Sequence, residues 1–126
     1  MVNYDLWDAN VICIEKNDGS TESCWIDPER SFWGDRIFDF ICVDNNPVFG
    51  LGSKKQAIEI YNKVIDKPIE INRENEIRYA FAQGLLGVIQ EVERYYRYTP
   101  RHFGWWRNTI SCIPIYKNAF KVLKNG

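Results

Sequence analysis

This chain has little histidine, and its cysteines lack the spacing of a zinc site. It has one histidine, His102, among 126 residues, and none of its four cysteines forms a C-x-x-C pair. A common zinc site needs four Cys or His ligands at close, regular spacings. The chain also lacks a P-loop, a G-x-G-x-x-G turn, a G-x-S-x-G elbow and an H-E-x-x-H pair. The sequence therefore predicts no metal, no cofactor and no recognisable catalytic motif.

Long apolar runs are missing as well. No stretch approaches the ~20 apolar residues that span a bilayer. The first ten residues, MVNYDLWDAN, do not place a basic region before an apolar one, as an export signal would. We therefore expect a cytoplasmic protein with no membrane partner. In that compartment cysteines stay reduced, so we expect buried free thiols at Cys13, Cys24, Cys42 and Cys112.

The composition is that of one soluble domain covering residues 1–126, with 45% apolar and 26% charged residues. The net charge of −1 hides an asymmetry. Residues 1–52 carry ten acidic and three basic residues, a net of −7, and residues 53–126 carry seven acidic and thirteen basic residues, a net of +6. Either the two halves attract each other within the chain, or the acidic half meets a basic partner.

Residues 11–26 have the pattern of a β-hairpin around Asn17-Asp18-Gly19. Asp-Gly supplies the positive φ angles of a tight turn. A two-residue loop at Asp18-Gly19 would set Cys13 opposite Cys24 and Glu15 opposite Glu22. Because two acids opposite each other are unfavourable, a three-residue loop is the alternative.

Five helices are predicted after the hairpin. The first covers 28–41, starts at Asp27-Pro28 and has Trp33, Ile37, Phe40 and Ile41 on one face. A strand is the alternative for 36–43, because a short apolar run fits both structures. The second helix covers 53–67, begins with a Ser53/Gln56 capping box and ends before Pro68.

The long helix at 73–98 is the strongest of these predictions. Its apolar stripe is expected to face the core and consists of Ile77, Phe81, Leu85, Val88, Val92 and Tyr95. Gly84 and Gly87 each cost about 1 kcal/mol relative to alanine, so another element should pack against the backbone there.

A short helix at 102–113 and a terminal helix from Pro114 complete the expected fold, the latter with Ile115, Ala119 and Val122 inward. The predicted class is α+β and helix-dominated, with an N-terminal hairpin packed on a helical body.

The stretch YYRYTPRHFGWWRN, residues 95–108, interleaves aromatic and basic side chains. One interpretation is a nucleic-acid-binding module that uses residues 94–107. Another is a small Cys/His enzyme that uses Cys112 and His102. The overall charge disfavours a phosphate binder, and no group that would orient the histidine is recognisable. We instead predict a structural junction between helices, with Trp105 or Trp106 buried and arginines over ring surfaces, and neither catalysis nor nucleic-acid binding.

The acidic half carries aromatic side chains surrounded by carboxylates. Charge of one sign speeds the encounter with an oppositely charged protein, and exposed rings supply buried contact area. We therefore predict a surface that binds a basic protein partner, made of Asp27, Glu29, Phe32, Trp33, Asp35, Asp39 and Asp44.

In this profile, a short chain without catalytic motifs and with an acidic binding half, the protein resembles the immunity proteins of bacterial toxin systems. Those of contact-dependent growth inhibition are the nearest group. The resemblance implies a non-enzymatic inhibitor that binds a cognate toxin domain, often a basic nuclease, and blocks its active site or substrate groove. It lies in the whole profile, so it assigns no individual residue. The basic C-terminal half departs from the simplest acidic inhibitor.

Overall fold

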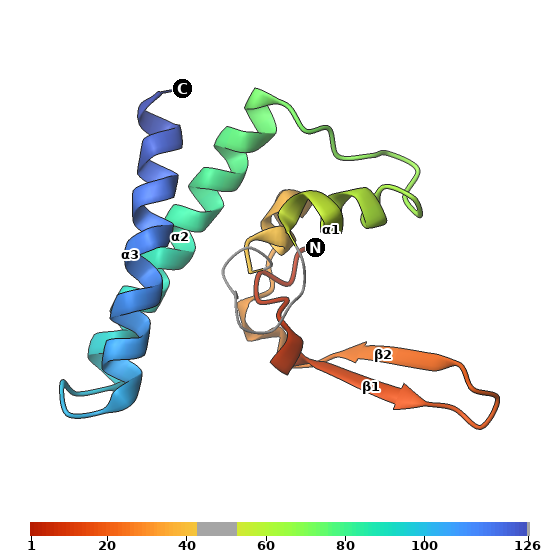
Figure 1. Ribbon diagram of the computed structural model, residues 1–126, viewed down its shortest axis with the longest axis horizontal. Helices are drawn as coiled ribbons and strands as arrows, with labels where there is room; N and C mark the ends of the chain where they lie inside the picture. Colours follow the sequence, from red (N-terminus) through yellow and green to blue (C-terminus); the bar gives the residue numbers. More distant parts are fainter. Residues whose placement is uncertain (43–52, 126) are drawn as a thin grey trace. The chain divides into compact units, whose positions relative to one another are not determined.

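A computed structural model describes residues 1–42 and 53–125, which belong to two compact units, residues 1–69 and 70–126. The predicted α+β, helix-dominated class is confirmed. Within these described residues, the first unit holds a hairpin, three 3-10 helices and one α-helix, and the second is a pair of long helices (Figure 1). The elements in order are η1 (Asp8–Asn10), β1 (Val11–Glu15), β2 (Thr21–Trp25), η2 (Pro28–Arg30), η3 (Arg36–Phe40), α1 (Lys54–Tyr61), α2 (Arg73–Arg97) and α3 (Phe103–Lys124).

The hairpin closes with a three-residue loop. Lys16 N–H donates to the Ser20 carbonyl at 2.8 Å, and Gly19 takes a φ of 79°. Strand partners are therefore Cys13 with Ser23 and Glu15 with Thr21. The two-residue loop, with Cys13 opposite Cys24, is wrong, and the three-residue alternative is confirmed. The glycine in the left-handed region allows this turn, and the resulting register keeps two acids from facing each other.

A continuous helix at 28–41 is wrong. Two short 3-10 helices, η2 and η3, stand there instead, and Ser31 and Asp35 between them are extended. The Asp35 carboxylate accepts a hydrogen bond from Ile37 N–H at 3.1 Å and so begins a new helix. Phe32 pairs its backbone with Val2 in an isolated antiparallel bridge. Local capping at Asp35 and this long-range pairing outweigh the helical spacing of the apolar residues.

The N-terminal segment packs into the core of its unit. Tyr4 is buried with a positive φ of 65°, and its ring lies 5.3 Å from that of Phe32, centroid to centroid. Asp5 pairs with Arg30 at 3.1 Å, and both side chains are largely shielded from solvent. The first unit thus joins residues far apart in the sequence, and its buried apolar side chains include Val2, Ile37, Phe40, Ile41, Ile58 and Ile69.

α1 begins with the predicted capping box of Ser53 and Gln56 but ends at Tyr61, six residues short of the predicted end. The cause is Asn62, whose side chain accepts from Ile69 N–H at 2.8 Å and donates to the Ile69 carbonyl at 2.9 Å. The returning chain therefore follows a turn, and Val64 is exposed.

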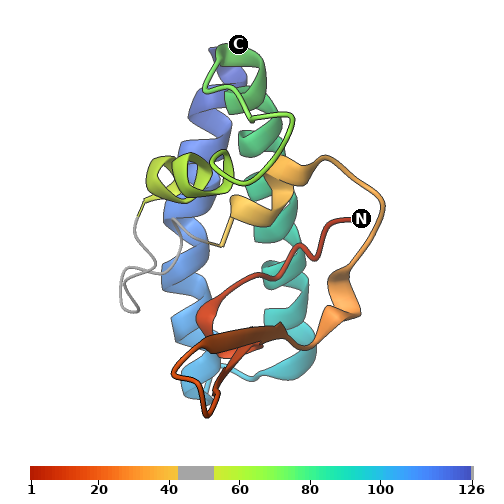
Figure 2. The same cartoon turned by 90° about the vertical axis from the view of Figure 1, so that its right-hand side faces the viewer.

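α2 and α3 lie side by side and run in opposite directions (Figures 1 and 2). The α2 bounds match the prediction within one residue. α3 is one helix that contains Pro114, so the predicted break there is wrong. A proline removes one helical N–H and distorts the preceding turn, yet packing against α2 holds both halves in one helix.

The glycines of α2 are where α3 approaches its backbone, as predicted. A Cβ on Gly87 would lie 2.7 Å from the Tyr116 ring, and one on Gly84 would lie 3.9 Å from Ala119 Cβ. The Tyr116 hydroxyl donates to the Gly87 carbonyl. Further along, Cys112 Sγ donates to Gln90 Oε1 at 3.1 Å. Small residues on α2 therefore admit large ones from α3.

The predicted core stripe of α2 is wrong. Phe81, Leu85, Val88, Val92 and Tyr95 are all exposed, and Ile77 is half-buried. The buried side of α2 carries small and large residues in equal number: Ala80, Ala82 and Gly87 are small, and Tyr79, Gln83 and Leu86 are large. On α3, Ile115 and Ala119 are buried as predicted, and Val122 is half-buried.

Candidate functional site

Three of the predicted partner-binding residues are exposed. Trp33 is the most open, with 86% of its surface accessible. Asp27 and Glu29, on either side of Pro28, are exposed as well. Asp27 precedes η2 with a left-handed φ of 57° but makes no side-chain cap, contrary to the expected N-cap acceptor. Asp27, Glu29 and Trp33 form what we call the acidic segment.

Three other predicted residues, Phe32, Asp35 and Asp39, make contacts within the first unit. Phe32 is half-buried between the rings of Tyr4 and Phe38, at 5.3 and 6.0 Å. Asp35 caps η3. Asp39 Oδ1 accepts hydrogen bonds from Asn3 N–H at 2.7 Å and Tyr4 N–H at 2.9 Å. Asp44 lies outside the described residues.

The carboxyl group of Asp39 has a shifted pKa. Burial raises its pKa above the ordinary value, and the two backbone N–H donors act in the opposite direction. Charging this group therefore costs desolvation that the backbone donors only partly offset. Asp39 anchors the N-terminal segment, and reversing its charge would test folding rather than partner binding.

The structure does not bring His102 and Cys112 together. His102 Nδ1 accepts from Gly104 N–H at 3.0 Å and so caps α3, and its ring stacks on Tyr98 at 4.9 Å. Cys112 is buried ten residues further along the helix, about 15 Å away at 1.5 Å per residue. A thiol–imidazole pair needs hydrogen-bond contact. These two residues do not form one.

The stretch 95–108 is the junction between α2 and α3, as predicted. Arg94 lies over the rings of Tyr95 and Trp105, 4.6 and 4.3 Å from their centroids. It also binds Glu91, which holds the pKa of Arg94 above its ordinary value, and donates to Thr109 Oγ1 at 3.0 Å. The expectation of a buried tryptophan is wrong, because Trp105 is half-buried and Trp106 is exposed.

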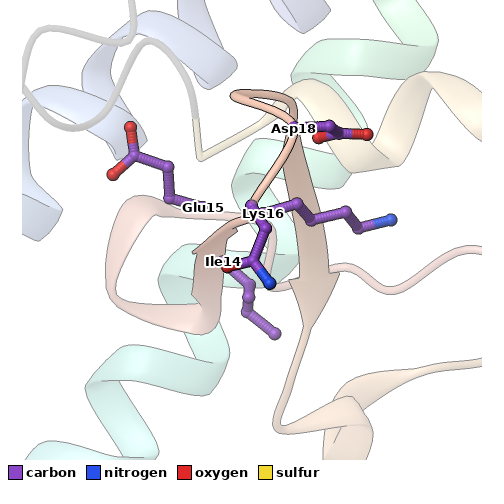
Figure 3. Close-up of a pocket in the computed structure, with 5 residues that line it drawn as sticks. Ile14, Glu15, Lys16 and Asp18 are labelled. Carbon is purple, nitrogen blue, oxygen red and sulfur yellow. The ribbon is translucent and has the colours of Figure 1, made fainter.

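Sequence reasoning missed the exposed apolar side chains of the hairpin. Ile12, Ile14 and Trp25 are each about half exposed. The hairpin extends away from the rest of its unit (Figure 1), and its tip forms an open depression lined by Ile14, Glu15, Lys16, Asn17 and Asp18 (Figure 3). The predicted hairpin itself was the available signal, since two strands alone cannot bury both of their faces.

The four cysteines divide into two pairs by exposure, and all four are free thiols. The expectation of buried thiols holds for Cys42 and Cys112 and is wrong for Cys13 and Cys24. Burial raises the pKa of Cys42 to about 12, and the nearby Asp5 adds to this effect.

Because the thiolate is the reactive form and must be reached by the reagent, we expect two fast and two slow cysteines. Iodoacetamide added to the native protein should modify Cys13 and Cys24 first, and all four in denaturant. Peptide mapping by mass spectrometry would assign each site. Equal rates for Cys42 and Cys13 in the native protein would contradict the division.

Within residues 1–42 and 53–125, no cluster of three or more His, Cys, Asp or Glu side chains could hold a metal ion. No helix in that part of the chain is both long and apolar enough to cross a bilayer. Comparison with known proteins finds no matching family model, no matching curated relative and no matching solved structure.

Proposed function

We propose that this protein is a non-enzymatic inhibitor of the immunity-protein type, which binds a basic toxin domain through its acidic segment. The observation that carries the proposal is Trp33, a large aromatic side chain 86% exposed, which follows two exposed carboxylates, Asp27 and Glu29, along the chain. An exposed tryptophan that a partner buries is a frequent hot spot of protein interfaces.

Charge supports the same proposal. The first unit, residues 1–69, has twelve acidic and seven basic residues, a net charge of −5, and residues 70–126 have a net charge of +4. A basic toxin domain would be drawn to the first unit over distances near the Debye length, about 8 Å at physiological salt. Trp33 would then supply the short-range contact, and the inhibitor would cover the toxin's substrate groove.

The probe we choose is the protein encoded next to this gene, because an immunity gene normally follows its toxin gene. We expect it to bind the wild-type chain, and Trp33→Ala to weaken binding by about 30-fold or more, the effect of losing a hot spot worth about 2 kcal/mol. The double variant Asp27→Lys/Glu29→Lys should chiefly lower the association rate and its salt dependence. Biolayer interferometry at several salt concentrations measures both.

Asp66→Lys is the matched control, since it reverses one exposed acid of the same unit outside the acidic segment. It should bind nearly as the wild type does. Circular dichroism would confirm that each variant folds. Unchanged affinity in both acidic-segment variants would rule out this binding surface. If the neighbouring protein fails to bind or to be inhibited, the immunity function is wrong.

A further inference from the structure

Each helix of the second unit leaves a stripe of large apolar side chains in solvent. On α2 the stripe is Phe81, Leu85, Val88, Val92 and Tyr95, with exposed fractions from 40% to 66%. On α3 it is Phe103, Trp106, Ile110, Ile113 and Phe120, with exposed fractions from 47% to 77%. Together these ten side chains form what we call the apolar face.

Both stripes have coiled-coil spacing. The α2 residues follow one another at intervals of four, three, four and three, and the α3 residues at three, four, three and seven. This is the heptad repeat by which one helix packs along another. Because α2 already meets α3 through other residues, including Gly84, Gly87 and Gln90, the stripes are additional to the contact between the two helices.

The two stripes lie on the same side of the helix pair. On α2, Leu85 and Val88 immediately follow Gly84 and Gly87, which face α3. The α3 stripe has the same relation to α2, since Ile110, Ile113 and Phe120 immediately follow residues that face α2, namely Thr109, Cys112 and Ala119. One residue turns about 100° around a helix axis. Viewed from one end of the pair, the chains of two antiparallel helices wind in opposite senses. A step of one residue past the contact therefore brings the stripes of both helices to the same face of the pair.

The face is large enough for a stable dimer. With about 200 Å² for a whole aromatic side chain, its five aromatic residues alone expose roughly 600 Å² at their observed exposures. At about 100 Å² for a whole aliphatic side chain, the five aliphatic residues add roughly 300 Å², which brings the total to roughly 900 Å². The largest apolar patch on a typical monomer is about 300–600 Å², and a stable interface buries about 800 Å² per partner.

We propose that the apolar face binds the same face of a second copy, so that two helix pairs form a four-helix bundle. None of the ten side chains is charged, which suits an equally apolar partner surface rather than a strongly charged one. A second copy presents such a surface with the same heptad spacing. Lys117 takes the heptad position between Ile113 and Phe120, where a single polar residue sets register and orientation. The proposal does not depend on the inhibitor function, because that function uses the acidic segment.

Analytical ultracentrifugation of the full chain under reducing conditions tests the dimer. We expect a mass of about twice 14.9 kDa at micromolar concentration. Val88→Asp on α2 and Ile110→Asp on α3 would each bury a charge in the bundle and should weaken dimerisation by at least about 100-fold.

Asn118→Asp on α3 is the matched control. Asn118 is exposed and immediately precedes Ala119, which faces α2, whereas the stripe residue Phe120 immediately follows it. The two neighbours of Ala119 therefore point to opposite sides of the helix pair, at about 100° per residue. The control introduces the same aspartate away from the apolar face and should leave the dimer intact.

Circular dichroism at 222 nm establishes that each variant keeps its helices. Because the two stripe variants are on separate helices, one of them still tests the proposal if the other fails to fold. A wild-type chain that stays monomeric at about 100 µM overturns the proposal, whatever else covers the face. So does a dimer that survives both stripe variants, or one that Asn118→Asp disrupts equally.

Discussion

Asp39→Ala is expected to destabilise the first unit by about 3 kcal/mol. The substitution removes the one oxygen, Oδ1, that accepts from both Asn3 and Tyr4 backbone N–H groups. An unsatisfied buried donor costs about 1–3 kcal/mol, and Tyr4 is fully buried. The loss should also release the N-terminal segment, because Tyr4 has a strained positive φ that surrounding contacts must hold. Urea denaturation followed by tryptophan fluorescence would measure the change.

Asp39→Asn is the matched variant, since its amide oxygen can accept the same two hydrogen bonds without a charge. Its stability at neutral pH should lie within about 1 kcal/mol of the wild type, because losing charge-assisted bonds is offset by removing a desolvated carboxylate. An Asp39→Ala protein as stable as the wild type would show that the anchor is unimportant.

The stability difference between the wild type and Asp39→Asn should change with pH in a defined direction. Burial raises the pKa of Asp39 in the folded state above its ordinary value in the unfolded chain. As the pH falls from above the folded pKa to below the unfolded value, the folded state takes up the proton first, and the wild type gains stability relative to Asp39→Asn. A stability difference that stays constant across this acidic window would contradict the raised pKa.

Gly87→Ala and Gly84→Ala, one helical turn apart on α2, are expected to change stability in opposite directions. At Gly87 the new methyl group would lie 2.7 Å from the Tyr116 ring, whose hydroxyl also binds the Gly87 carbonyl. Overpacking of this kind costs about 1–3 kcal/mol. At Gly84 the methyl group would meet Ala119 Cβ at 3.9 Å, an ordinary contact. There the helix propensity of alanine should stabilise the protein by about 0.5–1 kcal/mol.

Urea denaturation followed by circular dichroism at 222 nm would measure both substitutions. The double variant Gly87→Ala/Tyr116→Ala serves as the control for the cause. Because the second substitution removes the ring that the first one meets, the double variant should lose less stability than the two single losses combined. If Gly87→Ala stabilises as Gly84→Ala does, α3 does not pack against α2 as described.

Helix α2 shows how far the sequence predicts this fold. The sequence predicts its ends at residues 73 and 98, and the structure places them within one residue, with the Asn72 side chain as the N-cap. Which face is buried depends on what lies opposite. Glycines let α3 approach closely, so the contact with α3 lies beside the most apolar stripe and not on it. Hydrophobic periodicity finds an apolar face but cannot tell a core from an interface.

The candidate site was predictable in composition and only partly in detail. The acidic residues were apparent from the charge distribution, and Trp33 is as exposed as a partner-binding residue requires. The roles of Asp35 and Asp39 could not be predicted from the sequence, because each role depends on irregular backbone. One caps a 3-10 helix, and the other binds the N-terminal segment some 35 residues earlier. A carboxylate that binds its own chain and one that is exposed to solvent look alike in sequence.

The hairpin register has a consequence for handling the protein. Cys13 pairs with Ser23, and Cys24 pairs with Ile12, so the two exposed thiols project from opposite faces of the ribbon. They cannot close an internal disulfide without a one-residue slip of the strands. Under oxidation each chain can therefore form disulfides with two other molecules, one through each exposed thiol. Air would join molecules end to end into covalent chains of growing length, where a different register would have sealed each molecule on itself.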